Sequence, residues 1–265
     1  MRNKSGNVYD MLCQALCAQM DLGCNEVVLN RKAQPLASPQ LRTLVLKKKT
    51  DQEPSAQPHD IPSEPASQTG FHLDQQPTFS SLQEHYEAIK NCTKCRLSEG
   101  RNKFVYGVGN VDADLLFIGE GPGAEEDRLG EPFVGRAGQL LDKILAAIEL
   151  TRDEVYIANM VKCRPPGNRD PQPDEMATCR PYLMEQIRLI KPKLICALGR
   201  ISGQALLNTT TPLGKLRNQW HDFNGIPLMV TYHPAALLRF PGYKKDTWED
   251  MKKLKARYVE LRGGK

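Results

Sequence analysis

The segment with the clearest chemical character is residues 119–138, GEGPGAEEDRLGEPFVGRAG, whose first nine positions hold three glycines and four acidic residues. Glycines let a ligand approach bare backbone N–H groups closely. A nucleotide-phosphate loop would carry Lys and Ser/Thr after its glycines, which this segment lacks, and its acids would repel a triphosphate. The glycine spacing also differs from the dinucleotide fingerprint G-x-G-x-x-G. We therefore expect a flat ligand that is neutral or becomes charged only during reaction.

Three further side chains extend this site. Phe133 offers an aromatic face, Asn159 an amide that both donates and accepts, and His233, in YHPAALLR, a ring donor. Each alone has an ordinary interpretation: a core aromatic, a turn cap and a structural histidine. Together with the glycine backbone they describe a pocket for a nucleobase turned out of its helix.

Four of the eight cysteines have the spacing of ligands. Cys92 and Cys95 form CTKC, and Cys163 and Cys179 flank a fifteen-residue insert rich in Pro, Gly and Asn. Four thiolates suit a tetrahedral zinc or an iron–sulfur cluster, and the spacing does not choose between them. Unrelated buried thiols are the remaining alternative, and Cys196, in an apolar run, is interpreted as a core residue.

Apolar runs alternate with helical stripes along the second part of the chain. Strand-like runs cover residues 113–119, 155–161, 193–199 and 227–232, and helical stripes cover 140–148 and 176–190, the second interrupted by Pro181. This alternation predicts a parallel sheet covered on both faces, with ligands at the carboxyl ends of its strands. Glu120, Asn159 and His233 all fall at such ends.

The chain divides into three regions. Residues 1–50 form an accessory segment with an amphipathic helix near 8–20, residues 51–80 a flexible linker rich in Pro, Gln and Ser, and residues 81–265 the main domain. The net charge of +5 comes from the main domain and is compatible with a polyanionic partner. No apolar run is long enough to span a bilayer and no secretory signal is evident, so we expect a cytoplasmic protein.

The segments GEGPGAEED, EPFVGRAGQLLD, YIANMVKCRPPGNRDPQPDE and YHPAALLR closely resemble the motifs of the family 4 uracil-DNA glycosylases, the iron–sulfur branch of that superfamily. The likeness runs from about Glu87 to the end of the chain. It implies a three-layer α/β/α sandwich with a central four-stranded parallel sheet. It also implies a structural [4Fe–4S] cluster on Cys92, Cys95, Cys163 and Cys179. The implied activity is removal of uracil from DNA by hydrolysis of its N-glycosidic bond, leaving an abasic site for base excision repair.

The resemblance also implies roles in uracil recognition. Phe133 would stack on the extruded base, Asn159 would read its N3–H and O4, and Glu126 would exclude the thymine methyl group. The backbone around Gly123 would cradle the ring. His233 would donate to O2, where negative charge grows as uracil departs.

The remaining implied roles concern water and DNA. Glu120 and the backbone of Gly121 would hold the attacking water, although better-known relatives carry an aspartate where this chain has Gly121. Leu237, Leu238 and Arg239 would press into the minor groove.

The implied partner is uracil-containing DNA, single- or double-stranded. We expect a monomer whose residues 1–50 are available to a protein partner. The alternative is a non-catalytic, metal-containing nucleic-acid-binding or assembly module with zinc on the cysteines. That alternative leaves the coincidence of Glu120, Phe133, Asn159 and His233 unexplained.

Overall fold

The computed structural model describes residues 79–263. The helix predicted near residues 8–20 and all but the last two residues of the predicted linker lie outside the described residues.

A six-stranded sheet forms the centre of the described domain, with the strand order β1-β3-β2-β4-β6-β5. Its strands are β1 (Val108–Gly109), β2 (Leu115–Gly119), β3 (Tyr156–Asn159), β4 (Leu194–Leu198), β5 (Trp220–Phe223) and β6 (Ile226–Thr231). The four central strands, β3, β2, β4 and β6, are parallel, as the apolar runs predict.

The prediction of a purely parallel, four-stranded sheet was incomplete. β1 and β5 add antiparallel edges, β1 on β3 and β5 on β6. β1 has only two residues, and β5 reads WHDF with one buried position, so neither has the apolar run that marks a central strand. β5 joins β6 through a tight turn at Asn224 and Gly225, both with positive φ.

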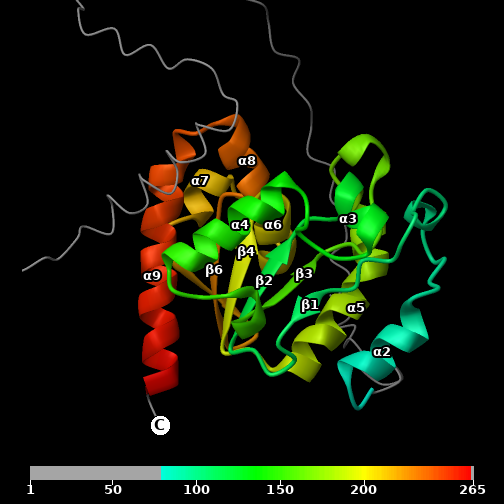
Figure 1. Cartoon of the computed structure of the whole chain (residues 1–265), viewed down its shortest axis with the longest axis horizontal. Coiled ribbons are helices and arrows are strands. Elements are labelled where there is room, and N and C mark those ends of the chain that lie inside the picture. Colours follow the sequence, from blue (N-terminus) through cyan, green and yellow to red (C-terminus); the bar gives the residue numbers. More distant parts are fainter. Residues whose placement is uncertain (1–78, 264–265) are drawn as a thin grey trace, which may run out of the picture. The chain divides into compact units, whose positions relative to one another are not determined.

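Helices cover both faces of the sheet, giving three layers (Figure 1). One face packs against α4 (Arg136–Ala147) and α9 (Tyr243–Gly263), and the other against α2 (Leu82–Ile89), α5 (Pro173–Ile190), α6 (Arg200–Leu207) and α7 (Leu213–Leu216). Successive residues of β2 alternate between the two cores: Leu115 and Phe117 join the first, Leu116 and Ile118 the second. The α/β sandwich predicted from the sequence is confirmed. None of the described helices has the length and apolarity needed to cross a membrane.

Pro181 does not interrupt the second helix, contrary to our expectation. α5 runs unbroken from Pro173 to Ile190 with Pro181 inside it. Proline removes one backbone N–H bond from the helix, but Leu183 and Ile187 bury their side chains against the sheet. Tertiary packing therefore holds α5 together across the missing bond.

Two short helices complete the frame of the site. α3 (Ala124–Leu129) follows β2, and α8 (Pro234–Arg239) follows β6. In the sheet register Gly119 lies opposite Asn159, and Leu198 lies opposite Thr231. The carboxyl ends of the central strands therefore bring Glu120, Asn159 and His233 to one edge.

Candidate functional site

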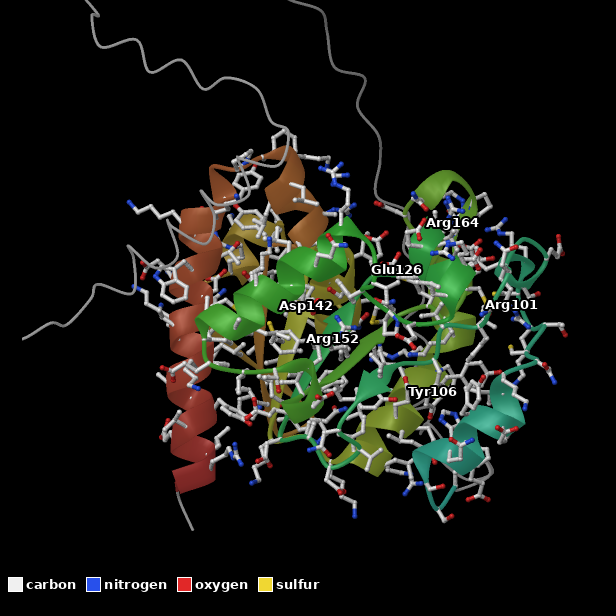
Figure 2. All side chains as sticks on the ribbon, viewed as in Figure 1. Arg101, Tyr106, Glu126, Asp142, Arg152 and Arg164 are labelled. Atoms are coloured by element: carbon white, nitrogen blue, oxygen red, sulfur yellow. The ribbon has the colours of Figure 1, made fainter. Side chains whose placement is uncertain are left out.

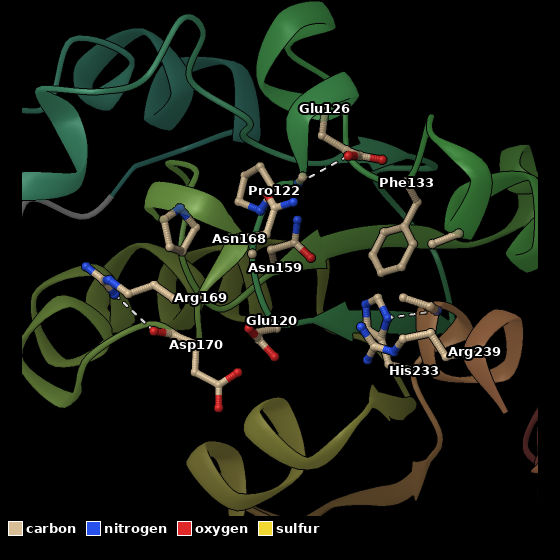
Figure 3. Close-up of a pocket in the computed structure, with 15 residues that line it drawn as sticks. Glu120, Pro122, Glu126, Phe133, Asn159, Asn168, Arg169, Asp170, His233 and Arg239 are labelled. Atoms are coloured by element: carbon tan, nitrogen blue, oxygen red, sulfur yellow. Dashed lines mark hydrogen bonds between the residues drawn. The ribbon is translucent and has the colours of Figure 1, made fainter.

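A pocket of about 310 Å³ lies at this edge (Figure 3). Eight of the predicted site residues line it: Glu120, Gly121, Gly123, Glu126, Phe133, Asn159, His233 and Arg239. Seven further lining residues were not predicted: Pro122, Ala137, Pro165, Asn168, Arg169, Asp170 and Ala235. The structure thus brings together residues that lie more than a hundred positions apart in the chain.

The back of the pocket is built on a close approach at Gly119. A Cβ atom placed there would lie 2.4 Å from Asn159 Oδ1 and 2.6 Å from Phe133 Cζ. Real Cβ contacts are not this short, so any other residue at 119 would displace both side chains. The last position of β2 is therefore bare so that the amide and the aromatic ring can seat against it.

Phe133 sits on a strained turn. Its φ of 54° lies in the left-handed region, which is costly for a residue with a bulky side chain. Arg152 stabilises the turn by donating to the carbonyl oxygens of Pro132 at 2.8 Å and Phe133 at 3.0 Å. Asp142 holds the same guanidinium at 2.8 Å, and Figure 2 shows the two side chains together.

Glu126 fixes the other side of this turn. Its carboxylate accepts hydrogen bonds from the backbone N–H groups of Val134 at 3.0 Å, Gly135 at 2.8 Å and Gly123 at 3.1 Å. The Gly123 bond also caps the start of α3. The carboxylate cannot leave the pocket wall without breaking these three bonds.

Asn159 is 2% exposed, and its side-chain oxygen Oδ1 has no hydrogen-bond partner among the described residues. An unpaired polar atom in such a position is costly. The buried Lys162 ammonium donates to the Asn159 carbonyl at 2.9 Å and to Gln186 at 2.6 Å, which anchors the end of β3. An anchored amide with a free oxygen facing a pocket is suited to accept from an N–H group of a ligand.

His233 is the N-cap of α8, and its Nδ1 accepts from the backbone N–H of Ala235 at 3.2 Å. Burial, reinforced by the nearby charge of Arg239, lowers the pKa of His233 to about 4. The ring is therefore neutral at physiological pH, and because Nδ1 accepts, the proton resides on Nε2. The His233 ring lies 5.4 Å from that of Phe133 at an interplanar angle of 32°.

Glu120 lies across the pocket from Phe133, close to Asp170 (Figure 3). Burial raises the pKa of Glu120 to about 7, and the charge of Asp170 adds to the rise against the opposing charges of Arg200 and Arg239. Such a carboxyl group can gain or lose a proton near neutral pH.

Gly121 lies beside Glu120 with little space around its Cα. A Cβ atom there would lie 2.7 Å from Val161 Cγ2. A side chain at 121 would require Val161 to move.

The lining residues that sequence reasoning missed come mainly from one loop, residues 165–170, after β3. In the sequence, this loop is recognisable only as the spacer between Cys163 and Cys179. Its position after a central strand was the available signal, because such loops line the ligand sites of α/β folds. Arg169 binds the buried carboxylate of Glu175 through both terminal nitrogens, and Arg200 binds Asp170 at 2.5 Å.

The three residues of α8 predicted to contact DNA differ in their exposure to solvent. Leu237 is 2% exposed and packs inward, whereas Leu238 is 41% exposed. Arg239 is exposed and lines the pocket. Leu237 therefore holds α8 in place, and only Leu238 and Arg239 present side chains to the surface.

The four predicted ligand cysteines belong to one region. Cys163 and Cys179 are buried in the core cluster that also contacts Cys92 and Cys95, and none forms a disulfide. Burial raises the pKa of Cys163 against the opposing effect of Arg101, and the nearby Cys95 and Cys92 add smaller increases. Within residues 79–263, no three His, Cys, Asp or Glu side chains are grouped so as to share one metal ion.

Donors surround these thiols. Arg101 donates to Cys163 Sγ at 3.3 Å, and the Tyr182 hydroxyl lies 3.2 Å from Cys92 Sγ. Figure 2 shows Arg101 on the side of the domain that carries α2. Two of the four sulfur atoms, those of Cys163 and Cys92, therefore have a side-chain hydrogen-bond donor.

The pocket combines an aromatic wall, an amide with an unpaired acceptor, a neutral histidine donor and a carboxyl group that titrates near pH 7. This arrangement suits a planar, uncharged ring with an N–H group on its edge. It also suits negative charge that develops on such a ring during bond cleavage.

Comparisons with known proteins identify the family of this chain. The family model described as the uracil DNA glycosylase superfamily matches residues 106–252. The chain is 40% identical over 182 residues to a type-4 uracil-DNA glycosylase of Archaeoglobus fulgidus, covering 66% of this chain and 92% of the relative. Type-4 enzymes of Pyrobaculum aerophilum and Saccharolobus solfataricus are 42% and 44% identical, covering 64% of this chain in each case and 91% and 82% of the relatives. The chain therefore belongs to the uracil-DNA glycosylase superfamily and, within it, to the type-4 family.

Proposed function

We propose that this protein removes uracil from DNA by hydrolysing the bond between the base and its deoxyribose. The products are free uracil and an abasic site, so the reaction is a first step of base excision repair. The names of the type-4 relatives support this activity. The observation that carries it is the buried Asn159 Oδ1, which has no partner among the described residues and which faces a pocket of base size.

Asn159 distinguishes uracil from cytosine by its hydrogen bonds. Its Oδ1 accepts from uracil N3–H, and its amide nitrogen donates to O4. Cytosine presents an acceptor at N3 and an amino donor at C4. These would place acceptor opposite Asn159 Oδ1 and donor opposite its amide nitrogen, and buried polar groups would be left unpaired. Phe133 stacks on the ring, and its fixed turn keeps this surface in place.

Glu126 separates uracil from thymine. Three backbone hydrogen bonds hold its side chain at the pocket wall. A methyl group on C5 of the base would meet a side chain that cannot move aside cheaply.

The chemical step leaves the bonding electrons on uracil. As the C1′–N1 bond breaks, the sugar acquires oxocarbenium character and negative charge accumulates on the base. His233 Nε2–H donates to O2, and because the ring is neutral it stabilises this charge without transferring a proton first. Water then adds to C1′ and loses a proton to solvent, and the uracil anion takes up a proton to leave as free uracil.

Glu120 orients that water. In its ionised form the carboxylate accepts a hydrogen bond from water and directs the oxygen lone pair toward C1′. Gly121 adds no side chain to this corner, where Asp170 is a second carboxylate close to Glu120.

Leu238 and Arg239 engage the DNA around the extruded nucleotide. Leu238 is an exposed apolar side chain next in sequence to the pocket-lining Arg239, suited to occupy space left in the base stack. Arg239 is an exposed cation that can pair with a phosphate.

Cys92, Cys95, Cys163 and Cys179 would hold a [4Fe–4S] cluster. When bound, the cluster would supply covalent cross-links between the segments that carry these cysteines. Arg96, next to Cys95, and Arg169, in the pocket wall, both bind the buried carboxylate of Glu175, at 2.7 Å and 2.6 Å. Fixing Cys95 in a cluster would therefore also limit the movement of the pocket loop, residues 165–170, because Arg96 and Arg169 share the Glu175 carboxylate.

The activity and the role of His233 are tested together by single-turnover cleavage of a uracil-containing oligonucleotide in chelator. We expect His233→Ala to lower the rate about 10²–10³-fold, because the donor to the developing anion is lost. His221→Ala is the control, since His221 bonds to the Leu216 carbonyl outside the pocket. Equal rates for the two variants would refute the role of His233, and an inactive wild-type protein would refute the function.

The pH dependence tests Glu120. Its carboxyl group is mostly protonated below pH 7 and ionised above it, so kcat/KM should rise with a midpoint near pH 7 and then level off. His233 contributes no step in this range because its pKa is about 4. In Glu120→Gln the rise should disappear and the rate at pH 8 should fall roughly 10²-fold. A rise with the same midpoint in the variant would assign the titration to another group.

Metal analysis tests the cysteine site. Protein purified without oxygen should contain about four irons and four acid-labile sulfides per chain and absorb at the violet end of the visible spectrum. Cys92→Ser should lose this absorption, because one thiolate ligand is missing. Cys196→Ala, in the buried strand β4, should keep it. Stoichiometric zinc in place of iron would overturn the assignment.

A further inference from the structure

Large apolar side chains are exposed on both sides of the pocket-lining Arg239 in the sequence. Leu238 is 41% exposed, Phe240 56% and Tyr243 38%. All three lie where α8 ends and α9 begins, at one end of the domain in Figure 1. Single exposed apolar residues are common, but three within six positions beside a binding pocket indicate a contact surface.

The aromatic part of this surface is held rigidly from below. Tyr243 stacks on Tyr232 with ring centroids 4.2 Å apart and an interplanar angle of 4°. The Arg217 guanidinium lies 4.2 Å from the Tyr232 ring centroid. Asp250, which is fully buried, binds Arg217 at 2.8 Å, and Asp246 binds it at 3.4 Å. The stacked rings of Tyr243 and Tyr232 are thus supported by the buried ion pair between Arg217 and Asp250.

Phe240 is placed by its backbone. Its N–H donates to the Ala236 carbonyl at 2.8 Å, and its own carbonyl accepts from the Tyr243 N–H at 3.1 Å. Its ring lies 5.7 Å from that of Tyr243, tilted by 53°. Tyr243 supports Phe240 on one side, and more than half of the Phe240 side chain faces solvent.

Cations flank the aromatic surface. Arg239 precedes Phe240, and Lys244 and Lys245 follow Tyr243. Asp246, the acidic residue nearest in sequence, is paired with Arg217. An exposed ring between cations is complementary to a nucleotide, whose base stacks while its phosphate pairs.

We propose that Phe240, supported by Tyr243, is a stacking platform for the base next to the extruded uridine in single-stranded DNA. The proposal rests on the proposed function, since it places the neighbouring nucleotide of the same substrate. Phe240 is the residue after Arg239, so the platform begins one residue from the pocket wall. In a duplex the neighbouring base is already stacked and paired, so the platform favours a single strand. It therefore sets the preferred form of the substrate.

The test uses the full chain and uracil-containing oligonucleotides, single-stranded and duplex. Phe240→Ala should weaken single-strand binding about tenfold, because one base–aromatic stack is lost. Duplex binding should change much less, and the single-turnover rate at saturating DNA should stay within about twofold of wild type. Phe240→Trp should restore binding, whereas Phe240→Leu should not. Val259→Ala, at a position 54% exposed on α9, is the control.

A fluorescent base reports the contact itself. With 2-aminopurine placed on the 5′ or the 3′ side of uracil, wild type should change the fluorescence at one of these positions, and Phe240→Ala should abolish that change. Equal single-strand binding by wild type and Phe240→Ala, or full binding by Phe240→Leu, would overturn the proposal while uracil release by wild type continued. A loss in the cleavage rate without a loss in binding would overturn it as well. Failure of wild type to release uracil would instead count against the proposed function.

Discussion

The site depends on the close approach of Asn159 and Phe133 to the bare Cα of Gly119. No Cβ atom fits between them, so the end of β2 acts as a flat base on which both groups rest. The Phe133 backbone reaches this position only in a strained conformation. Arg152 holds that conformation by donating to the Phe133 carbonyl, and Glu126 holds it by accepting from the Gly135 N–H. The aromatic wall is consequently rigid before any ligand arrives, which is the condition for stabilising a transition state without reorganisation.

Burial links the chemistry of the remaining groups. Exclusion of water leaves Asn159 Oδ1 unpaired, keeps His233 neutral and raises the pKa of Glu120 toward neutrality. Each effect has a cost in the free protein, since polar groups are desolvated without full compensation. In the proposed function, a uracil ring would compensate for this cost by supplying an N–H group to the amide and an oxygen to the imidazole. Discrimination against other bases follows from the same desolvation.

The sequence was most informative where chemistry and periodicity coincided. Buried apolar runs located the four parallel strands, and residue types at their ends located Glu120, Asn159 and His233 near one another. The edge strands β1 and β5 escaped notice because they are short and polar. Local spacing also cannot show that Leu237 faces the core while Leu238 faces solvent, or that Asn168 and Arg169 fold back over the pocket. Those facts depend on long-range packing, as does the continuity of α5 through Pro181.

The central claim is that Asn159 selects uracil by offering an acceptor to its N3–H. The most direct measurement compares base release from single-stranded oligonucleotides that differ only in carrying uracil or cytosine at one position. Released bases are counted by chromatography, and abasic sites by alkaline scission. We expect free uracil with a matching number of abasic sites, and cytosine left in place. Release of both bases at similar rates, or of neither, would contradict it.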